Sequence, residues 1–344
     1  MELGISTFGE ITPDHTAGKA VNAHRRAQEL LAEAKLADEI GLDVYALGEH
    51  HRSDYFISAP EVMLAAVAAV TKRIRLTSAV TVLSSADPVR TFQNFATLDL
   101  ISNGRAEIMA GRGSFIESFP LFGYDLQHYD ELFTEHLELL LKINASEKVT
   151  SRGKHRASIN SLGVYPRPYQ EKLPIWLAVG GTPASMVRAG TLNLPVTVAI
   201  LGSAPEHFVS LVKLYRDSAK KAGHDETKLQ LAMNCHMHIA ESSQQASDEF
   251  WPTYEKLMTK IGKERGWGKL TREQFEWMRS PKGPLLVGSP EEVVEKIIYQ
   301  HGLFNHTRFL AQTIAGPDLS HEQQLRSIKL FGTQVAPVIR ERIK

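Results

Sequence analysis

The sequence has a single cysteine, Cys235, and no excess of charge of either sign. One cysteine excludes an intramolecular disulfide and any cysteine-rich metal site. Lys plus Arg and Asp plus Glu both number 39, so there is no net positive field to attract a nucleic-acid backbone. We therefore expect a cytoplasmic protein, in a reducing compartment, with no nucleic-acid partner.

Long hydrophobic runs are also missing. No stretch approaches the roughly 18 apolar residues of a membrane-spanning helix, and the N-terminus has no basic segment followed by an apolar one. We expect no membrane association. A hydrophobic content of 43% with 23% charged residues is instead typical of a globular chain that buries a sizeable core.

Short β-prone segments alternate along the chain with amphipathic helical patterns. This alternation predicts an α/β fold with a parallel sheet covered by helices, and eight units predict a single (β/α)8 TIM barrel over residues 1–344. Residues 146–167 interrupt the pattern as an extended hairpin. The eight strand candidates are residues 3–8, 42–47, 74–83, 105–110, 174–179, 195–200, 229–240 and 309–313.

The pattern also breaks after the seventh strand. Residues 241–284 are long, charged and rich in tryptophan. We interpret them as a partly helical insertion that forms a mobile lid over the strand ends.

Three ionisable residues, Glu49, His50 and His51, follow directly after the second predicted strand. In parallel barrels, ligands bind at the carboxyl ends of the strands, so polar groups there indicate a site. A solvated surface loop is an equally valid interpretation of these three residues alone. Residues 79–83 of the third strand likewise fit either an ordinary core strand or a flat surface for a planar ring.

Two glycine-containing segments indicate a phosphate pocket. Arg112 lies between two glycines, which allows close backbone approach beside a bidentate guanidinium. Gly180 and Gly181 precede a predicted helix, whose free N–H groups attract a dianion. Because these segments follow the fourth and fifth strands, they would be neighbours in a barrel. Each alone also fits a plain turn or an ordinary helix cap.

Other catalytic classes have little support. His236 and His238 share a strand face and could bind a metal ion, but no Asp or Cys accompanies them at ligand spacing, so we expect no metal. The chain has no Gly-x-Ser-x-Gly elbow of a serine hydrolase. It also has no Walker A lysine.

Six short segments follow one another in an order that is specific as a set. The segments are residues 42–51, 79–83, 87–90, 98–105, 111–113 and 180–183. With them the chain resembles the bacterial luciferase-like flavin-dependent monooxygenase family over nearly its whole length. The resemblance implies a (β/α)8 barrel, FMN as the cofactor and a homodimer.

The resemblance also implies roles for individual residues. His50 matches the catalytic histidine beside the flavin, and Glu49 matches the acid next to it. Ala79 and Val80 match a non-prolyl cis peptide that packs against the flavin ring. Arg112 matches the arginine that holds the phosphate. The second half of that phosphate site is matched by Gly180, Gly181 and Ser185.

The implied reaction is oxygenation of a small organic substrate by reduced FMN and O2. A separate flavin reductase would supply the reduced FMN as co-substrate, because the chain has no visible nicotinamide fingerprint. His50 would act as acid or base with a pKa near neutrality. Two departures argue against light emission and long-chain aldehydes: Gly111 replaces a reactive cysteine of the luciferase α subunit, and the insertion differs from the luciferase lid.

Two other functions remain open: a hydride-transfer oxidoreductase that uses a deazaflavin or FMN, and a non-catalytic flavin-binding protein. The sequence does not identify the substrate. Specificity is expected in the loops at the strand ends, which are rich in aromatic residues. These loops are residues 11–20, 53–59 and 114–130, together with the lid.

Overall fold

Eight parallel strands close into a barrel in the computed structural model, which describes residues 1–11 and 22–343. The expected (β/α)8 fold is confirmed, and each barrel strand lies within or beside its predicted range. Pairing of the last strand with the first closes the barrel. In barrel order the strands are β1 (Glu2–Thr7), β2 (Val44–Leu47), β3 (Arg75–Ser78), β5 (Ala106–Gly111), β8 (Ile175–Val179), β9 (Val196–Ala199), β10 (Leu231–Ile239) and β12 (Arg308–Gln312).

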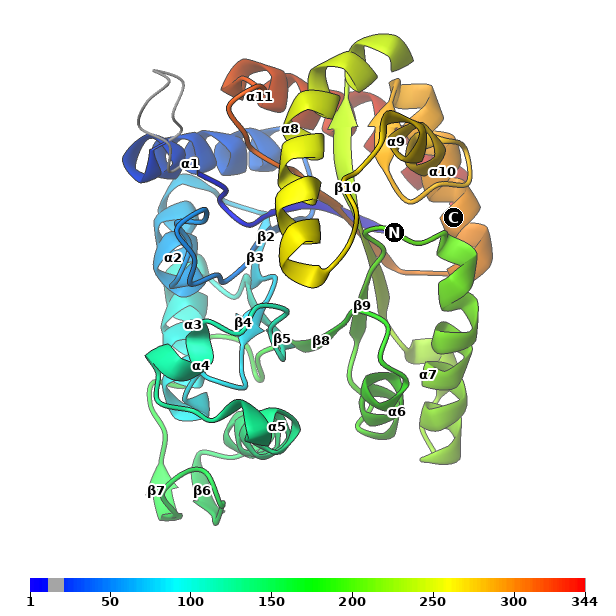
Figure 1. Ribbon diagram of the computed structural model, residues 1–344. Coiled ribbons are helices and arrows are strands. Elements are labelled where there is room, and N and C mark those ends of the chain that lie inside the picture. The colour runs from blue at the N-terminus through cyan, green and yellow to red at the C-terminus, as the bar shows by residue number, and fades with distance from the viewer. Residues whose placement is uncertain (12–21, 344) are drawn as a thin grey trace.

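Helices surround the strands (Figure 1). Several begin at a proline, whose fixed φ suits the first helical turn. The sequence pattern predicts one closing helix over residues 322–343, but residues 331–335 form a π-helical turn that interrupts it. The surrounding helices are α1 (Ala23–Glu39), α2 (Pro60–Val70), α3 (Pro88–Ser102), α4 (Ser118–Leu121), α5 (Tyr129–Ala145), α6 (Pro183–Thr191), α7 (Val209–Lys221), α10 (Pro290–Phe304), α11 (His321–Leu330) and α12 (Ala336–Arg342).

The lower interior of the barrel is filled by side chains. The Arg308 guanidinium forms two hydrogen bonds to the Glu107 carboxylate, at 2.7 and 3.1 Å, and lies 4.2 Å from the centre of the Trp176 ring. All three residues are buried. The barrel is therefore not an open pore, and space for a ligand lies at the carboxyl ends of its strands.

The predicted insertion contains two helices, α8 (Ser243–Arg265) and α9 (Arg272–Arg279). They pack on an apolar cluster of their own that includes Phe250 and Phe275. In Figure 1, α8 crosses in front of the barrel. The short strands outside the eight-strand ring are β4 (Thr81–Val82), β11 (Leu286–Gly288) and the antiparallel pair β6 (Lys148–Ser151) and β7 (Ile159–Gly163), which is the hairpin predicted over residues 146–167.

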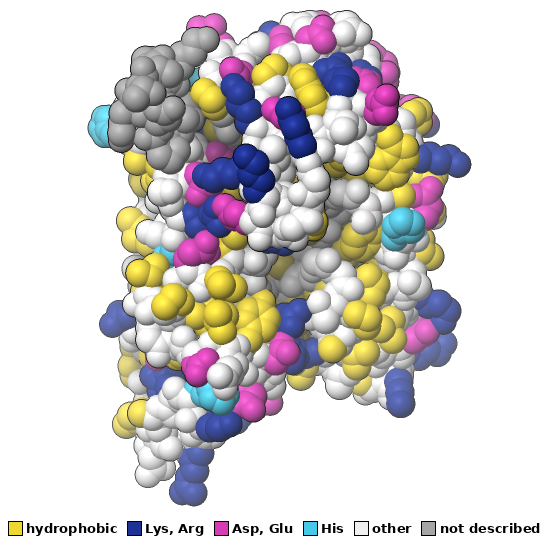
Figure 2. All heavy atoms as spheres, in the orientation of Figure 1, with side chains coloured by type: hydrophobic (Ala, Val, Ile, Leu, Met, Phe, Trp, Pro, Cys, Tyr) yellow, Lys and Arg dark blue, Asp and Glu magenta, His cyan; other side chains and the backbone are white. Residues whose placement is uncertain are grey.

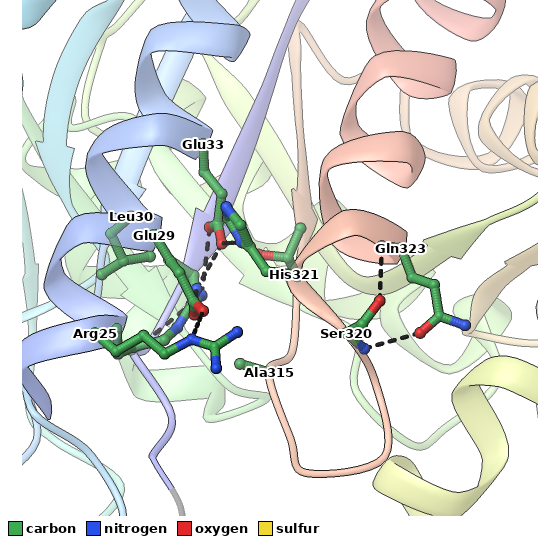
Figure 3. A network of polar contacts seen from close by, with 12 residues as sticks. Arg25, Glu29, Leu30, Glu33, Ala315, Ser320, His321 and Gln323 are labelled. Atoms are coloured by element: carbon green, nitrogen blue, oxygen red, sulfur yellow. Dashed lines mark hydrogen bonds and ion pairs between the residues drawn. The ribbon is translucent and has the colours of Figure 1, made fainter. Parts of the chain in front are cut away.

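Charged side chains are buried between α1 and the chain that leads into α11 (Figure 3). The fully buried Arg26 donates a 2.5 Å hydrogen bond to Glu33, which also faces His321 at 3.5 Å. Nearby, the buried Glu10 accepts a hydrogen bond from the backbone N–H of Ala315. Burial raises the pKa of Glu10 to about 7 despite the opposing effect of Arg26.

No helix among residues 1–11 and 22–343 is long and apolar enough to cross a bilayer.

Candidate functional site

His50 lies just beyond the end of β2, inside a group of aromatic side chains. Its ring centre is 4.4 Å from those of Phe8 and Tyr55 and 5.4 Å from that of Phe115. The Tyr55 ring is nearly parallel to the imidazole. Only 8% of His50 is exposed, so these rings exclude most of the solvent from it.

This burial changes the expected chemistry of His50. Loss of solvation lowers its pKa to about 4, so the expectation of a pKa near neutrality is wrong for the free protein. The imidazole is neutral at pH 7. Among the described residues, no hydrogen-bonding group contacts its buried Nδ1 atom. The hydrogen-bonding capacity of that nitrogen is therefore unused within the described part of the chain.

The Glu49 carboxylate is fully used in local contacts. One oxygen lies 2.8 Å from Nε2 of His51, and the other accepts a hydrogen bond from the backbone N–H of Val82. The backbone N–H of Glu49 donates to the carbonyl of Val80. Glu49 thus connects the end of β2 to the segment between β3 and β4.

The peptide bond between Ala79 and Val80 is cis, as the resemblance implied. It follows β3 directly and lies next to the end of β5. A Cβ atom added to Gly111 would approach Cγ2 of Val80 to 2.7 Å. This contact explains why glycine, and not a cysteine, precedes Arg112.

Arg112 follows β5 and reaches two neighbouring elements. One of its nitrogens donates to Oγ1 of Thr182 at 2.9 Å, and the other lies 2.6 Å from a carboxylate oxygen of Asp130 on α5. Thr182 is the N-cap of α6, yet its side chain makes no capping hydrogen bond. Thr182 therefore holds the N-cap position without capping the helix through its side chain, which contacts Arg112 instead.

The two glycines before α6 leave open space beside the backbone. A Cβ atom at Gly180 or Gly181 would meet nothing within 4 Å, and Gly181 has a φ of 122° that favours glycine. Ser185 lies in the first turn of α6 and lines one cavity together with Arg112. The structure therefore brings the predicted phosphate-binding residues to the same edge of the barrel.

Sequence reasoning missed Arg188, which lines the same cavity. It lies three residues after Ser185, and this helical spacing places both side chains on one face of α6. The spacing was visible in the sequence. Without the structure, however, nothing distinguished Arg188 from an ordinary solvent-exposed helical arginine.

The predicted catalytic and phosphate-binding residues form two groups that meet at one contact. His50 and Glu49 belong to the β2 end, whereas Arg112 and Ser185 belong to the cavity between β5 and α6. The packing of Gly111 against Val80 joins the two groups.

The histidines of β10 do not share a ligand position. Nδ1 of His236 lies 3.3 Å from the Tyr254 hydroxyl, whereas Nε2 of His238 lies 2.9 Å from the Glu249 carboxylate. Separate partners argue against a metal ion between these two rings.

A different group, away from the strand ends, brings potential metal ligands together. The ligand atoms of His128, Glu131 and His155 lie within 4.8 Å of one another. However, Nζ of Lys154 is 2.8 Å from the same Glu131 oxygen that His155 contacts. A protein cation therefore already occupies this carboxylate.

The C-terminal end of α8 lies over the loops that follow β2 and β5. Arg52 forms a bidentate ion pair with Glu264, at 2.6 and 2.8 Å, and Lys260 contacts Asp54. Arg52 and Arg265 both lie over the Phe115 ring, at 4.5 and 5.3 Å. Figure 2 shows this face of the molecule hollowed beside α8. Most of the predicted specificity loop 11–20 lies outside the described residues.

A (β/α)8 barrel with two arginines lining a cavity and a buried histidine at its carboxyl edge has the architecture of a ligand-binding barrel enzyme. The sequence profile of luciferase-like monooxygenases matches residues 1–306, so the chain belongs to that family. Monooxygenase RslO1 from Streptomyces bottropensis is similar over 98% of this chain and 99% of its own, with 26% identity and a TM-score of 0.86.

Two further solved structures share the fold but differ in cofactor. The oxygenating constituent of 3,6-diketocamphane monooxygenase from Pseudomonas putida, in complex with FMN, is 21% identical with a TM-score of 0.76. The coenzyme F420 dependent tetrahydromethanopterin reductase of Methanopyrus kandleri is 20% identical with a TM-score of 0.74. Each likeness covers 98% of this chain and 99% of that chain.

Proposed function

We propose that the protein is a monooxygenase that uses reduced FMN and O2 to oxygenate a small organic substrate. In the balanced reaction, one oxygen atom enters the substrate, the other leaves as water, and reduced FMN becomes oxidised FMN. The observation that carries this proposal is the convergence of Arg112, Ser185 and the open turn at Gly180 and Gly181 on the barrel edge that also holds the buried His50.

The residues present fit a flavin phosphate. The Arg112 guanidinium and the Ser185 hydroxyl line one cavity, and the backbone at Gly180 and Gly181 has open space beside it. These are donors suited to a phosphate dianion at a helix N-terminus. Ala79 and Val80 lie between this cavity and the β2 end, where the flavin ring would be held.

Once bound, the reduced flavin supplies the electrons that activate O2. The protein's own contribution is to orient the ring and exclude water. His50 is neutral in its aromatic surroundings, so it acts through a hydrogen bond or by accepting a proton at the free Nδ1 atom. Glu49 holds the segment between β3 and β4, and we assign it a positioning role that acts through Val82.

The insertion completes the site as a lid in this proposal. Its helix α8 is fixed to the barrel loops by Glu264 and Arg265. Release of these contacts would open the strand ends to substrate, and their formation would exclude water during oxygenation.

We also propose a separate flavin reductase and a homodimer. Neighbouring helices α2 and α3 expose apolar side chains: Val62 is 70% exposed and Ile101 is 53% exposed. Apolar side chains on adjacent helices suit an interface with a second copy of the chain.

The second candidate is a hydride-transfer oxidoreductase that uses F420, as the Methanopyrus kandleri structure suggests. The two functions differ in their response to oxygen. Under anaerobic conditions the protein is titrated with reduced FMN and, separately, with reduced F420, and each complex is then mixed with air-saturated buffer. Binding of reduced FMN with altered reoxidation kinetics supports the monooxygenase. Binding of F420 but not of FMN would support the hydride-transfer enzyme instead. Binding of FMN without oxygen consumption would indicate a non-catalytic flavin-binding protein.

A further inference from the structure

Two arginines line the anion cavity, although only one was predicted. Arg188 donates a 2.9 Å hydrogen bond to the Thr134 hydroxyl of α5, and its guanidinium lies 5.3 Å from the Phe133 ring centre. Its pKa is lowered by burial and by the positive charge of Arg112. The two cations are therefore close enough to repel each other across the cavity they share.

A carboxylate of the protein partly neutralises this pair. Asp130 lies 2.6 Å from Nη1 of Arg112, although 72% of the Asp130 side chain is exposed. Because water competes strongly for so exposed a carboxylate, the contact is weak and can exchange. Asp130 lies in the first turn of α5, and Thr134 lies one turn later on the same helix.

We infer that Arg112 and Arg188 form a paired site for a phosphomonoester dianion, and that Asp130 occupies Arg112 until the dianion displaces it. This inference rests on the proposed function, and it requires that the cofactor carry a phosphomonoester group. Displacement of Asp130 leaves two positive charges to match the two negative charges of the phosphate. A flavin without a phosphate gains nothing from either arginine.

The arrangement would limit how tightly the phosphate is held, equally for reduced and oxidised FMN, because the phosphate charge does not depend on the redox state of the flavin ring. An internal carboxylate that returns to Arg112 weakens retention of the phosphate and thereby favours exchange of the cofactor. Asp130 is therefore expected to reduce FMN affinity, in contrast to the two arginines, which increase it.

The test compares reduced FMN with reduced riboflavin in anaerobic titrations followed by protein tryptophan fluorescence. Wild-type protein should bind FMN more tightly than riboflavin. Arg188→Gln should weaken FMN binding about 10- to 100-fold. Asp130→Asn should strengthen it by about fivefold. Neither variant should change riboflavin binding.

Two further variants separate this explanation from general effects. Arg188→Lys keeps the charge and should restore part of the FMN affinity. Glu39→Gln removes one exposed negative charge from α1, where Glu39 pairs with Lys35, so it should leave FMN affinity nearly unchanged. A melting temperature for each variant verifies that it is folded.

The outcomes distinguish the inference from the proposed function. Equal affinity for FMN and riboflavin, unchanged FMN binding by Arg188→Gln, or weaker binding by Asp130→Asn would overturn the inference and leave a flavin enzyme. Failure of the wild-type protein to bind either flavin would overturn both.

Discussion

Glu49 and Val82 are joined by a 2.8 Å hydrogen bond from the Val82 backbone N–H to the Glu49 carboxylate. The bond crosses from the end of β2 to β4 and spans the Ala79–Val80 peptide. Each oxygen of the carboxylate has a partner within the protein, so Glu49 is held in place between His51 and Val82. Its position next to His50 therefore indicates support of the site rather than proton transfer.

Replacement of Glu49 should separate these two roles. Glu49→Ala leaves the buried Val82 N–H without an acceptor and should destabilise the protein by about 1–3 kcal/mol. Glu49→Gln keeps one acceptor oxygen and should cost less than half of that. Thermal and urea unfolding of both variants measures the difference. Equal destabilisation by Gln and Ala would mean that the contact to Val82 contributes little.

Substitution of His50 should affect oxygen chemistry more than flavin binding. His50→Asn removes the imidazole, whereas the cavity lined by Arg112 and Ser185 stays intact. We expect reduced FMN to bind within about threefold of wild type and oxygenation to fall by about 100-fold. Stopped-flow absorbance should show that bound FMN is reoxidised at nearly the same rate as free reduced FMN. A wild-type trace in His50→Asn would remove this residue from the mechanism.

Buried histidines should make the protein unstable in acid. Burial lowers the pKa of His50 and His236 to about 4 and that of His306 to about 3, from an ordinary value of 6.5. The unfolded chain therefore binds these protons first, so stability is complete above pH 6.5 and is lost as the pH falls toward 4. His306→Leu should remove about 3 kcal/mol of this loss at pH 4. Urea unfolding of the wild type and of His306→Leu between pH 7 and 4 measures the loss of stability in each protein.

His306 offers a clean test because neither of its ring nitrogens contacts a polar group among the described residues. The exposed His207 provides a matched control. His207→Ala should leave the pH dependence of stability unchanged. If His306→Leu and wild type lost stability in parallel, another group would have to account for the acid sensitivity.

Glu10 should have the opposite pH dependence. Its pKa is raised from 4.5 to about 7, so its stabilising contribution is complete below pH 4.5 and is lost as the pH rises through 7. At pH 8 an ionised carboxylate must be buried beside Arg26 and Glu33. Glu10→Gln keeps an acceptor for the Ala315 N–H and should stabilise the protein at pH 8 by up to about 3 kcal/mol. Melting curves at pH 5 and 8 should show the gain only at the higher pH.

The contact between Arg52 and Glu264 should control the mobility of α8. Glu264→Gln removes a bidentate ion pair, but Arg52 retains Asp54 and Glu117 as partners. Global stability should change by less than about 1 kcal/mol. Amide hydrogen exchange should accelerate in the last two turns of α8. Lys256 lies on the same helix and forms an ion pair with Asp318, which lies outside α8, so Lys256→Gln serves as the control.

The sequence was sufficient to predict the barrel because its strands are continuous apolar segments separated by capped helices. It also predicted that Arg112, Gly180, Gly181 and Ser185 gather at one edge of the barrel, because the segments that carry them follow neighbouring strands. It did not predict the pKa of His50, which depends on rings from three separate segments. The contacts of Thr182 and Arg188 could not be predicted either, because they join segments that come together only in the folded barrel.

The close packing of Gly111 on Val80 limits how this family can change one residue at a time. A cysteine at position 111 would collide with the Val80 side chain in this chain. The two positions therefore have to change together, with a smaller residue at 80 arising first or at once. Family members with a larger residue at position 111 are therefore expected to have a smaller residue at position 80. If position 111 changed first, the intermediate protein would have to accommodate the collision.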